Sequence, residues 1–73
     1  MGKRKLSMTN RVKELRAEAG GMTQQQLADR VGVTRQTINV IEANKYSPSL
    51  EVAFLIARSL NKRLEEVFGL SEN

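Results

Sequence analysis

Four side chains that can form hydrogen bonds with a partner lie close together near the middle of the chain: Arg35, Gln36, Thr37 and Asn39. Ile38 and Ile41 occur among them at helical spacing, so a helix over about residues 35–43 would have one apolar and one polar face. Thr34 is a natural N-cap for it, because its hydroxyl can accept a hydrogen bond from a backbone N–H of the first turn. Such a helix would pack on a core through one face and leave the other for a partner.

A second short helix is predicted immediately before this one, over residues 24–31. Thr23 and Gln26 have the spacing of a capping box, in which each side chain bonds the backbone N–H of the other residue. The apolar face of this helix consists of Leu27, Ala28 and Val31. Gly32 then favours a helix end, because glycine readily adopts the left-handed conformation found there. The two helices would be joined by a tight turn over residues 31–34.

Three further helices are expected, at about residues 10–19, 50–60 and 64–68. Thr9 or Asn10 would cap the first, and Asn44 suits the left-handed position that follows the helix ending near residue 43. The helix over residues 50–60 has an apolar stripe expected to face inward: Leu50, Ala53, Ile56, Ala57 and Leu60. No strand alternation and no internal repeat are evident. We therefore expect an all-α fold, a compact five-helix domain over residues 9–70.

Composition and charge limit the classes of protein. The 73 residues suffice for one domain, and a net charge of +4 with a pI near 10.0 favours a polyanionic partner. The basic residues concentrate near the start of the chain: Lys3, Arg4, Lys5, Arg11, Lys13 and Arg16. Residues 1–8 are expected to form a flexible basic arm, which either follows phosphates or is a solvated terminus.

Several functional classes are disfavoured. No apolar run approaches the roughly 20 residues of a membrane span, and no signal-peptide pattern follows the basic start, so a cytoplasmic location is expected. The chain has no histidine and no cysteine, and it has neither a glycine-rich phosphate loop nor a carboxylate pair in an expected pocket. We therefore expect no enzyme activity, no metal site and no cofactor.

Four motifs follow one another in a fixed order: TQQQLA at 23–28, VGVTRQTI at 31–38, IEANKYSPSL at 41–50 and LEEVF at 64–68. Through these motifs, residues from about 10 to 68 resemble the helix-turn-helix domain of the Cro/phage-repressor, or Xre-type, regulators. The resemblance implies a lambda-repressor-like DNA-binding domain whose third helix enters the major groove. That groove is about 12 Å wide and admits a helix, and its base edges present a distinct pattern for each base pair.

The resemblance also implies roles for individual residues. Base contacts are implied for the outward positions of the recognition helix: Arg35, Gln36, Thr37, Asn39 and Val40. Arg35 could pair with guanine, Gln36 with adenine, and Val40 could touch a thymine methyl group. Phosphate contacts are implied for residues around that helix: Gln24, Thr34, Asn44, Lys45 and Ser47. Arg16 and Glu42 match a pair that forms a structural salt bridge in relatives.

We therefore expect a sequence-specific transcriptional regulator that binds double-stranded DNA, represses from a palindromic operator as a homodimer, and associates with the prokaryotic nucleoid when bound. The apolar residues outside the inward stripe either form the dimer surface or complete the core: Phe54, Leu55, Phe68 and Leu70. Two alternatives stay open. One is an antitoxin or restriction-modification controller of the same family that acts with a partner protein, and the other is a protein-binding adaptor that does not read DNA.

Overall fold

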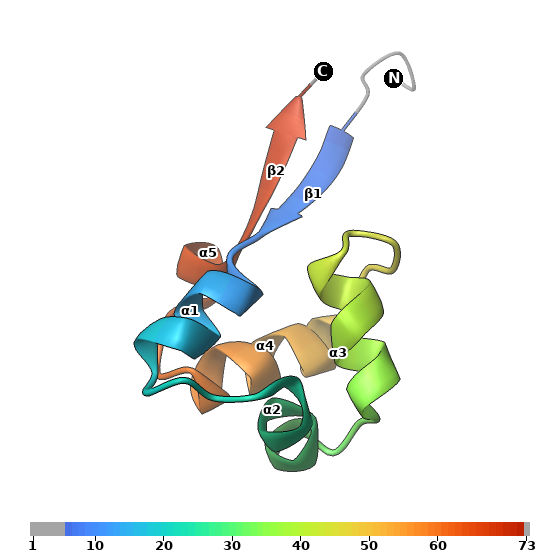
Figure 1. Ribbon diagram of the computed structural model, residues 1–73. Helices are drawn as coiled ribbons and strands as arrows, with labels where there is room; N and C mark the ends of the chain where they lie inside the picture. The colour runs from blue at the N-terminus through green and yellow to red at the C-terminus, as the bar shows by residue number, and fades with distance from the viewer. Residues whose placement is uncertain (1–5, 73) are drawn as a thin grey trace.

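The computed structural model describes residues 6–72 (Figure 1). Lys3, Arg4 and Lys5, which belong to the predicted basic arm, lie outside the described residues. Five helices and two strands follow one another along the chain: β1 (Leu6–Asn10), α1 (Val12–Glu18), α2 (Gln24–Val31), α3 (Arg35–Glu42), α4 (Leu50–Ser59), α5 (Leu64–Val67) and β2 (Phe68–Glu72). The five predicted helices are present. The last of them ends at Val67, one residue earlier than expected, because Phe68 has the extended backbone of a strand.

The prediction of a purely α-helical fold was wrong at the two ends of the chain. β1 and β2 form an antiparallel two-stranded ribbon that extends beyond the helices (Figure 1). Residues 6–8, which the sequence placed in a flexible arm, belong to β1. Met8 lies directly opposite Leu70, and Asn10 lies opposite Phe68. Directly opposed residues share one face of a sheet, so the apolar residues of the two strands gather on the same side.

The caps predicted from the sequence are present around α2 and α3. The Thr23 hydroxyl accepts a hydrogen bond from Gln26 N–H, and the Gln26 side chain accepts one from Thr23 N–H, at 3.0 and 2.9 Å. Gly32 ends α2 in the left-handed conformation, with φ of 89°. Thr34 caps α3 through a hydrogen bond from Thr37 N–H. These local contacts explain why two helices of only eight residues each begin and end where they do.

Helices α3 and α4 end in the same way. Asn44 and Asn61 follow their respective helices, and both have a φ of 58°. After α3, Lys45 N–H bonds Val40 C=O and Asn44 N–H bonds Ile41 C=O, which is the Schellman pattern. After α4, the N–H groups of Lys62 and Asn61 make the corresponding bonds to the C=O groups of Ala57 and Arg58. The left-handed conformation predicted for Asn44 is thereby confirmed.

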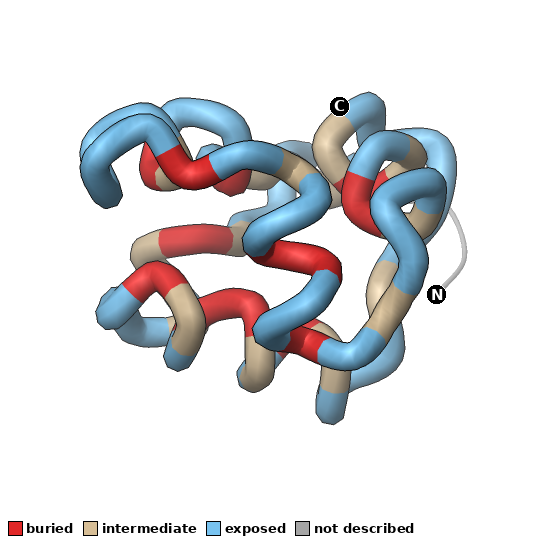
Figure 2. Tube along the Cα trace, turned by 60° about the horizontal axis from the view of Figure 1, so that its bottom comes forward, coloured by how far each residue is buried: buried red, intermediate tan, exposed pale blue. Residues whose placement is uncertain are grey.

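The helices enclose one hydrophobic core, and buried positions occupy the inward turns of the chain (Figure 2). Its largest fully buried side chains come from α1 to α5: Val12, Leu27, Ile38, Ile41, Ile56 and Val67. The inward stripe of α4 is correct from Ala53 onward. Leu50 was placed in that stripe wrongly, because it is the first residue of α4 and remains 68% exposed.

Candidate nucleic-acid interface

Helix α3 is divided into a buried and an exposed side. Ile38 and Ile41 retain 0% and 1% of their accessible surface, so they fix α3 to the core. Three of the five residues assigned to base contact are exposed, namely Arg35, Gln36 and Asn39. Thr37 and Val40 are half-buried. The structure therefore places all five on or beside one accessible side of α3.

The crossing of α2 and α3 sets the position of that side. Ala28 of α2 is fully buried in the core, and its small side chain permits α3 to approach α2 closely. Gly32 provides the left-handed residue of the turn, and Val33 packs partly against the core. Because the turn and the helix crossing are both fixed by packing, the position of α3 is set by its neighbours in the domain.

Gln24, at the start of α2, contacts two of the residues assigned to base contact. Its side-chain N–H₂ group donates to Glu42 Oε1 at 3.0 Å and to Asn39 Oδ1 at 3.4 Å. Its carbonyl oxygen accepts a hydrogen bond from Arg35 Nη1 at 3.4 Å. Gln24 thus links α2 to residues on the exposed side of α3 and to Glu42 at the C-terminal end of that helix.

Arg16 and Glu42 form the expected ion pair between α1 and α3. The guanidinium group donates to both carboxylate oxygens, with Nε to Oε2 at 2.7 Å and Nη2 to Oε1 at 3.0 Å. Arg16 Nη1 also donates to the Met22 carbonyl at 2.7 Å. The two side chains are only 13% and 7% exposed. Because the pair is largely desolvated and fully hydrogen-bonded, it ties α3 to the scaffold.

The other residues assigned to phosphate contact surround α3. Thr34 lies at its N-terminus, and its hydroxyl also shares a hydrogen bond with the Thr37 hydroxyl at 2.9 Å. Asn44, Lys45 and Ser47 are exposed in the loop that follows its C-terminus. Helix α3 is about 12 Å long at 1.5 Å per residue, so these groups flank a surface short enough to enter one groove.

Two residues of this region had no functional role in the sequence analysis. Tyr46 is 56% exposed and lines a shallow hollow together with Gln36, Thr37 and Val40. It is the chain's single tyrosine and directly follows Lys45, which is a signal that could have drawn attention to it. The sequence predicts only a capping role for Asn10, yet its side chain reaches the C-terminal end of α3. No local pattern in the sequence indicates that contact.

The basic cluster near the start of the chain is smaller in the folded protein than in the sequence. Arg11 forms a two-point pair with Glu14 and lies 3.9 Å from Glu18. The hydrogen bond and charge of Glu14 raise the pKa of Arg11, and the same contact lowers the pKa of Glu14. Arg16 is paired with Glu42. Among the described residues of that cluster, only Lys13 is exposed without an ion pair.

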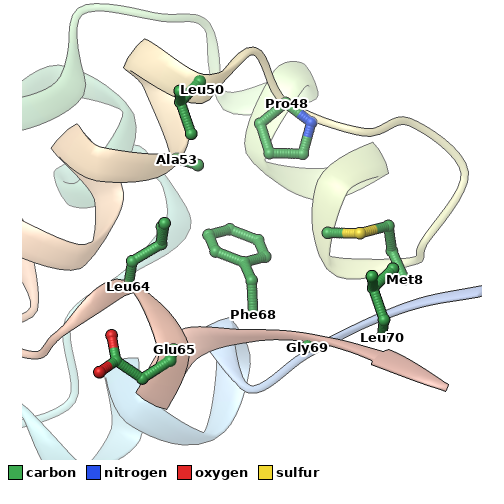
Figure 3. Close-up of a pocket in the computed structure, with 9 residues that line it drawn as sticks. All are labelled: Met8, Pro48, Leu50, Ala53, Leu64, Glu65, Phe68, Gly69 and Leu70. Atoms are coloured by element: carbon green, nitrogen blue, oxygen red, sulfur yellow. The ribbon is translucent and has the colours of Figure 1, made fainter.

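The residues assigned to dimer contact divide into two kinds. Phe54 and Leu70 are 48% and 66% exposed. Leu55 and Phe68 are partly buried and pack against the core. Phe68 also lines an apolar hollow of about 570 Å³ between the ribbon, α5 and the start of α4. Figure 3 shows its ring directed toward Pro48 and Ala53, with Met8 and Leu70 beside each other at the ribbon end of the hollow.

The described residues contain neither a metal-binding cluster nor a membrane-spanning helix. Over residues 6–72, no group of three or more acidic, histidine or cysteine side chains is arranged to hold a metal ion. None of the helices in this described part of the chain has the length and apolar character required to cross a membrane.

Comparison with known proteins agrees with this geometry. A helix-turn-helix family model matches residues 12–67. An uncharacterized HTH-type transcriptional regulator of Archaeoglobus fulgidus is 49% identical over 65 residues, which covers 89% of this chain and 90% of the relative. The uncharacterized HTH-type transcriptional regulator YgzD of Bacillus subtilis is 48% identical over 65 residues, covering 89% of this chain and 97% of its own.

A solved structure also shares the fold. The crystal structure of a Bacteroides fragilis protein, provisionally described as DNA-binding, superposes with a TM-score of 0.76 and 32% identity. The match covers 85% of this chain and 98% of that protein. Fold and exposed helix together define a helix-turn-helix protein. The chain belongs to the Cro/C1-type helix-turn-helix family of transcriptional regulators, as the resemblance in sequence predicted.

Proposed function

We propose that the protein is a sequence-specific regulator that represses transcription by binding a palindromic operator as a homodimer, with α3 in the major groove. The observation that carries this proposal is the division of α3 into two sides. Ile38 and Ile41 are buried, whereas Arg35, Gln36 and Asn39 are exposed. A helix divided in this way can insert its polar side into the groove while its apolar side stays in the core.

The chemistry of the exposed side suits base recognition. The planar guanidinium of Arg35 can donate to O6 and N7 of guanine, and the amide of Gln36 can pair with N6 and N7 of adenine. The contacts of Gln24 with Arg35 and Asn39 are both 3.4 Å long, near the limit for a hydrogen bond. Gln24 can therefore hold these side chains in orientation before binding, and base edges can replace its contacts at small cost.

Backbone anchoring would come from Gln24, Thr34 and the loop after α3. Lys45 is exposed and supplies a positive charge, while Asn44 and Ser47 supply donors. Each neutralised phosphate should contribute about 0.9 to the slope of log K against log salt on B-DNA. The affinity would therefore depend strongly on salt, whereas sequence preference would come from α3.

A homodimer would join two copies through exposed apolar residues of the ribbon and α4, namely Leu70 and Phe54. Phe54 and Leu70 are the exposed members of the predicted set, whereas Leu55 and Phe68 are partly buried and pack against the core. An isolated two-stranded ribbon is only marginally stable, so covering its apolar face would stabilise it. A two-fold dimer would place the two recognition helices about 34 Å apart, one turn of DNA.

The proposal is tested by selecting bound sequences from random duplex DNA and measuring their affinity across salt concentrations. Enrichment of one palindromic motif is expected. Arg35→Ala should weaken binding to that operator by about 10- to 100-fold and leave nonspecific duplex binding nearly unchanged. Arg58→Ala is the matched control, because Arg58 is an exposed arginine of α4 that lies beside Asn61, Lys62 and Arg63, none of which is assigned to DNA contact. Failure to enrich any motif contradicts sequence-specific regulation and favours the adaptor alternative.

The homodimer is tested separately by sedimentation of the protein with and without its operator. Phe54→Ser combined with Leu70→Ser should convert a dimer into a monomer that keeps its helical circular dichroism. A protein that sediments as a monomer, and binds the operator with one copy per site, contradicts the homodimer. Stoichiometric binding of a second protein in place of a second copy would indicate the antitoxin or controller alternative.

A further inference from the structure

Asn10 makes contacts that its place in the sequence does not suggest. It is the last residue of β1 and is half-buried. Its Oδ1 atom accepts a hydrogen bond from Val12 N–H at 3.0 Å, at the start of α1. Its Nδ2 atom donates to Asn44 Oδ1 at 2.8 Å, and to the Ile41 and Glu42 carbonyls at 3.1 and 3.3 Å. One side chain thus joins the ribbon, α1 and the end of α3.

The contact with Asn44 fixes the orientation of a second amide group. The oxygen and nitrogen of a side-chain amide diverge from the same carbon within one plane, so a contact that fixes the oxygen also fixes where the nitrogen lies. Asn10 Nδ2 donates to Asn44 Oδ1, so it is the oxygen of the Asn44 amide, and not the nitrogen, that is turned toward Asn10. Asn44 is exposed, so its two N–H donors are available at the surface beyond α3. A phosphate oxygen accepts hydrogen bonds but donates none, so only this orientation suits a phosphate contact.

The backbone at Asn44 supports the same orientation. Asn44 has a φ of 58°, and the hydrogen bonds of the Schellman pattern fix its Cα relative to α3. The Asn10 amide also bonds two carbonyls at the last turn of α3, which have few partners within the helix. The side chain of Asn44 is therefore fixed both at its Cα, by the backbone, and at its Oδ1, by Asn10.

We propose that Asn10 is a positioning residue for DNA binding: it holds the Asn44 amide with its N–H₂ group outward, ready to donate to a backbone phosphate. This inference rests on the proposed function, since it requires a phosphate beside Asn44. It adds a role for a residue of β1, Asn10, which lies 34 positions before Asn44 in the chain. Through its hydrogen bond, this strand residue determines which atoms the loop after the recognition helix presents to a phosphate.

A double-mutant cycle on the selected operator tests the proposal. Asn10→Ser keeps a short acceptor for Val12 N–H and removes the amide donor. Asn44→Gly keeps the left-handed backbone and removes the side chain. Each single variant should weaken operator binding by about tenfold, the typical effect of one lost hydrogen bond to a charged group. In the Asn44→Gly background, Asn10→Ser should add less than a further twofold loss.

Asn61→Gly provides the matched control, because Asn61 has the same φ of 58° and the same Schellman bonds after α4. It should leave the operator affinity unchanged. Additive losses from Asn10→Ser and Asn44→Gly would overturn the proposal, since a residue that only stabilises the fold should act independently of the Asn44 side chain. All affinities are compared at a temperature at which circular dichroism shows each variant to be folded.

A measurement without DNA keeps this inference distinct from the proposed function. In nuclear magnetic resonance spectra of the free protein, the side-chain N–H₂ protons of Asn10 should exchange slowly, and Asn44→Gly should speed up the exchange of one of them. Unchanged exchange overturns the Asn10–Asn44 contact whatever the protein binds. Failure to enrich any DNA sequence overturns the proposed function and the phosphate role of Asn44 together.

Discussion

Two arginine–glutamate pairs in this protein have the same geometry and different surroundings. Arg16 and Glu42 make two hydrogen bonds of 2.7 and 3.0 Å, and Arg11 and Glu14 make two of 3.2 and 3.0 Å. The side chains of the first pair are 13% and 7% exposed, whereas those of the second are 51% and 57% exposed. The first pair joins α1 to α3, and the second lies at the start of α1 alone.

The difference shows why a list of ion pairs says little about stability. The exposed pair forms by replacing hydrogen bonds with water in a medium of high dielectric constant, so its net contribution to the free energy of unfolding is small. The buried pair holds two charges out of water, and each would lack compensation if the other were removed. Glu42 also accepts a hydrogen bond from Gln24, so the buried pair reaches the residues that face the proposed DNA groove. Scaffold and interface are therefore joined at one carboxylate.

The largest effect is expected from Glu42→Ala. This change leaves the Arg16 guanidinium buried without its counter-charge and should lower the free energy of unfolding by about 3–5 kcal/mol. Urea unfolding followed by circular dichroism measures it. Glu14→Ala is the matched control and should leave the urea midpoint within experimental error. Equal shifts for the two variants would contradict the role assigned to burial.

A smaller effect is expected from Arg16→Lys. Lysine keeps the positive charge but lacks the planar fork, so it cannot bond both Glu42 oxygens and the Met22 carbonyl together. The free energy of unfolding should fall by about 1–3 kcal/mol, less than for Glu42→Ala. Arg11→Lys should have little effect, since water can replace the lost donors at that exposed site. A destabilisation from Arg16→Lys no larger than that from Arg11→Lys would mean that the fork geometry is unimportant.

Gln24→Ala should separate stability from DNA recognition. The hydrogen bond to Glu42 is partly buried, so its loss should lower the free energy of unfolding by about 0.5–1.5 kcal/mol. The contacts with Arg35 and Asn39 are also lost, which should weaken binding to the selected operator more than binding to nonspecific duplex. Gln25→Ala, in the next position of α2, serves as the control. If Gln24→Ala changes neither the free energy of unfolding nor operator preference, the connection between scaffold and interface is refuted.

The smallest effect concerns the stability of the fold at acidic pH, to which the exposed carboxylates Glu14 and Glu66 contribute. The Arg11 hydrogen bond holds the pKa of Glu14 below its ordinary value, and the Arg63 backbone N–H does the same for Glu66. A carboxylate with a lowered pKa in the folded state stabilises the fold above the unfolded pKa of about 4.3. That contribution is lost as the pH falls through the folded pKa.

Glu14→Gln should therefore slightly flatten the loss of thermal stability below about pH 4.3, the unfolded-state pKa of a glutamate, and leave the melting temperature at pH 7 nearly unchanged. Thermal melts at a series of pH values measure both. A steeper decline in acid for the variant than for the original chain would have the wrong sign for a lowered pKa. Glu66→Gln should behave in the same direction.

The caps of α2 and α3, the approximate helix positions and the two sides of α3 were predictable because their signals are local. The prediction that Thr9 or Asn10 caps the first helix was wrong, because α1 begins at Val12 and its N-cap is Arg11. Thr23, Gln26 and Gly32 act within one or two helical turns, and the spacing of Ile38 and Ile41 defines a buried side without reference to the rest of the chain. The ribbon was missed because each strand has only five residues and its partner lies at the opposite end of the chain. Leu6 and Met8 do alternate with polar residues, but so short an alternation does not by itself predict a strand.

The sequence by itself determined the approximate positions of the five helices, the caps of α2 and α3, and which residues of α3 face outward, because capping and helical periodicity act between near neighbours. Only the tertiary structure decided that β1 meets β2, that Leu50 stays exposed, and that Asn10 reaches Asn44. It also distinguished the Arg16–Glu42 pair from the Arg11–Glu14 pair by burial. Those facts depend on contacts between distant segments, and such contacts exist only once the core has brought the segments together.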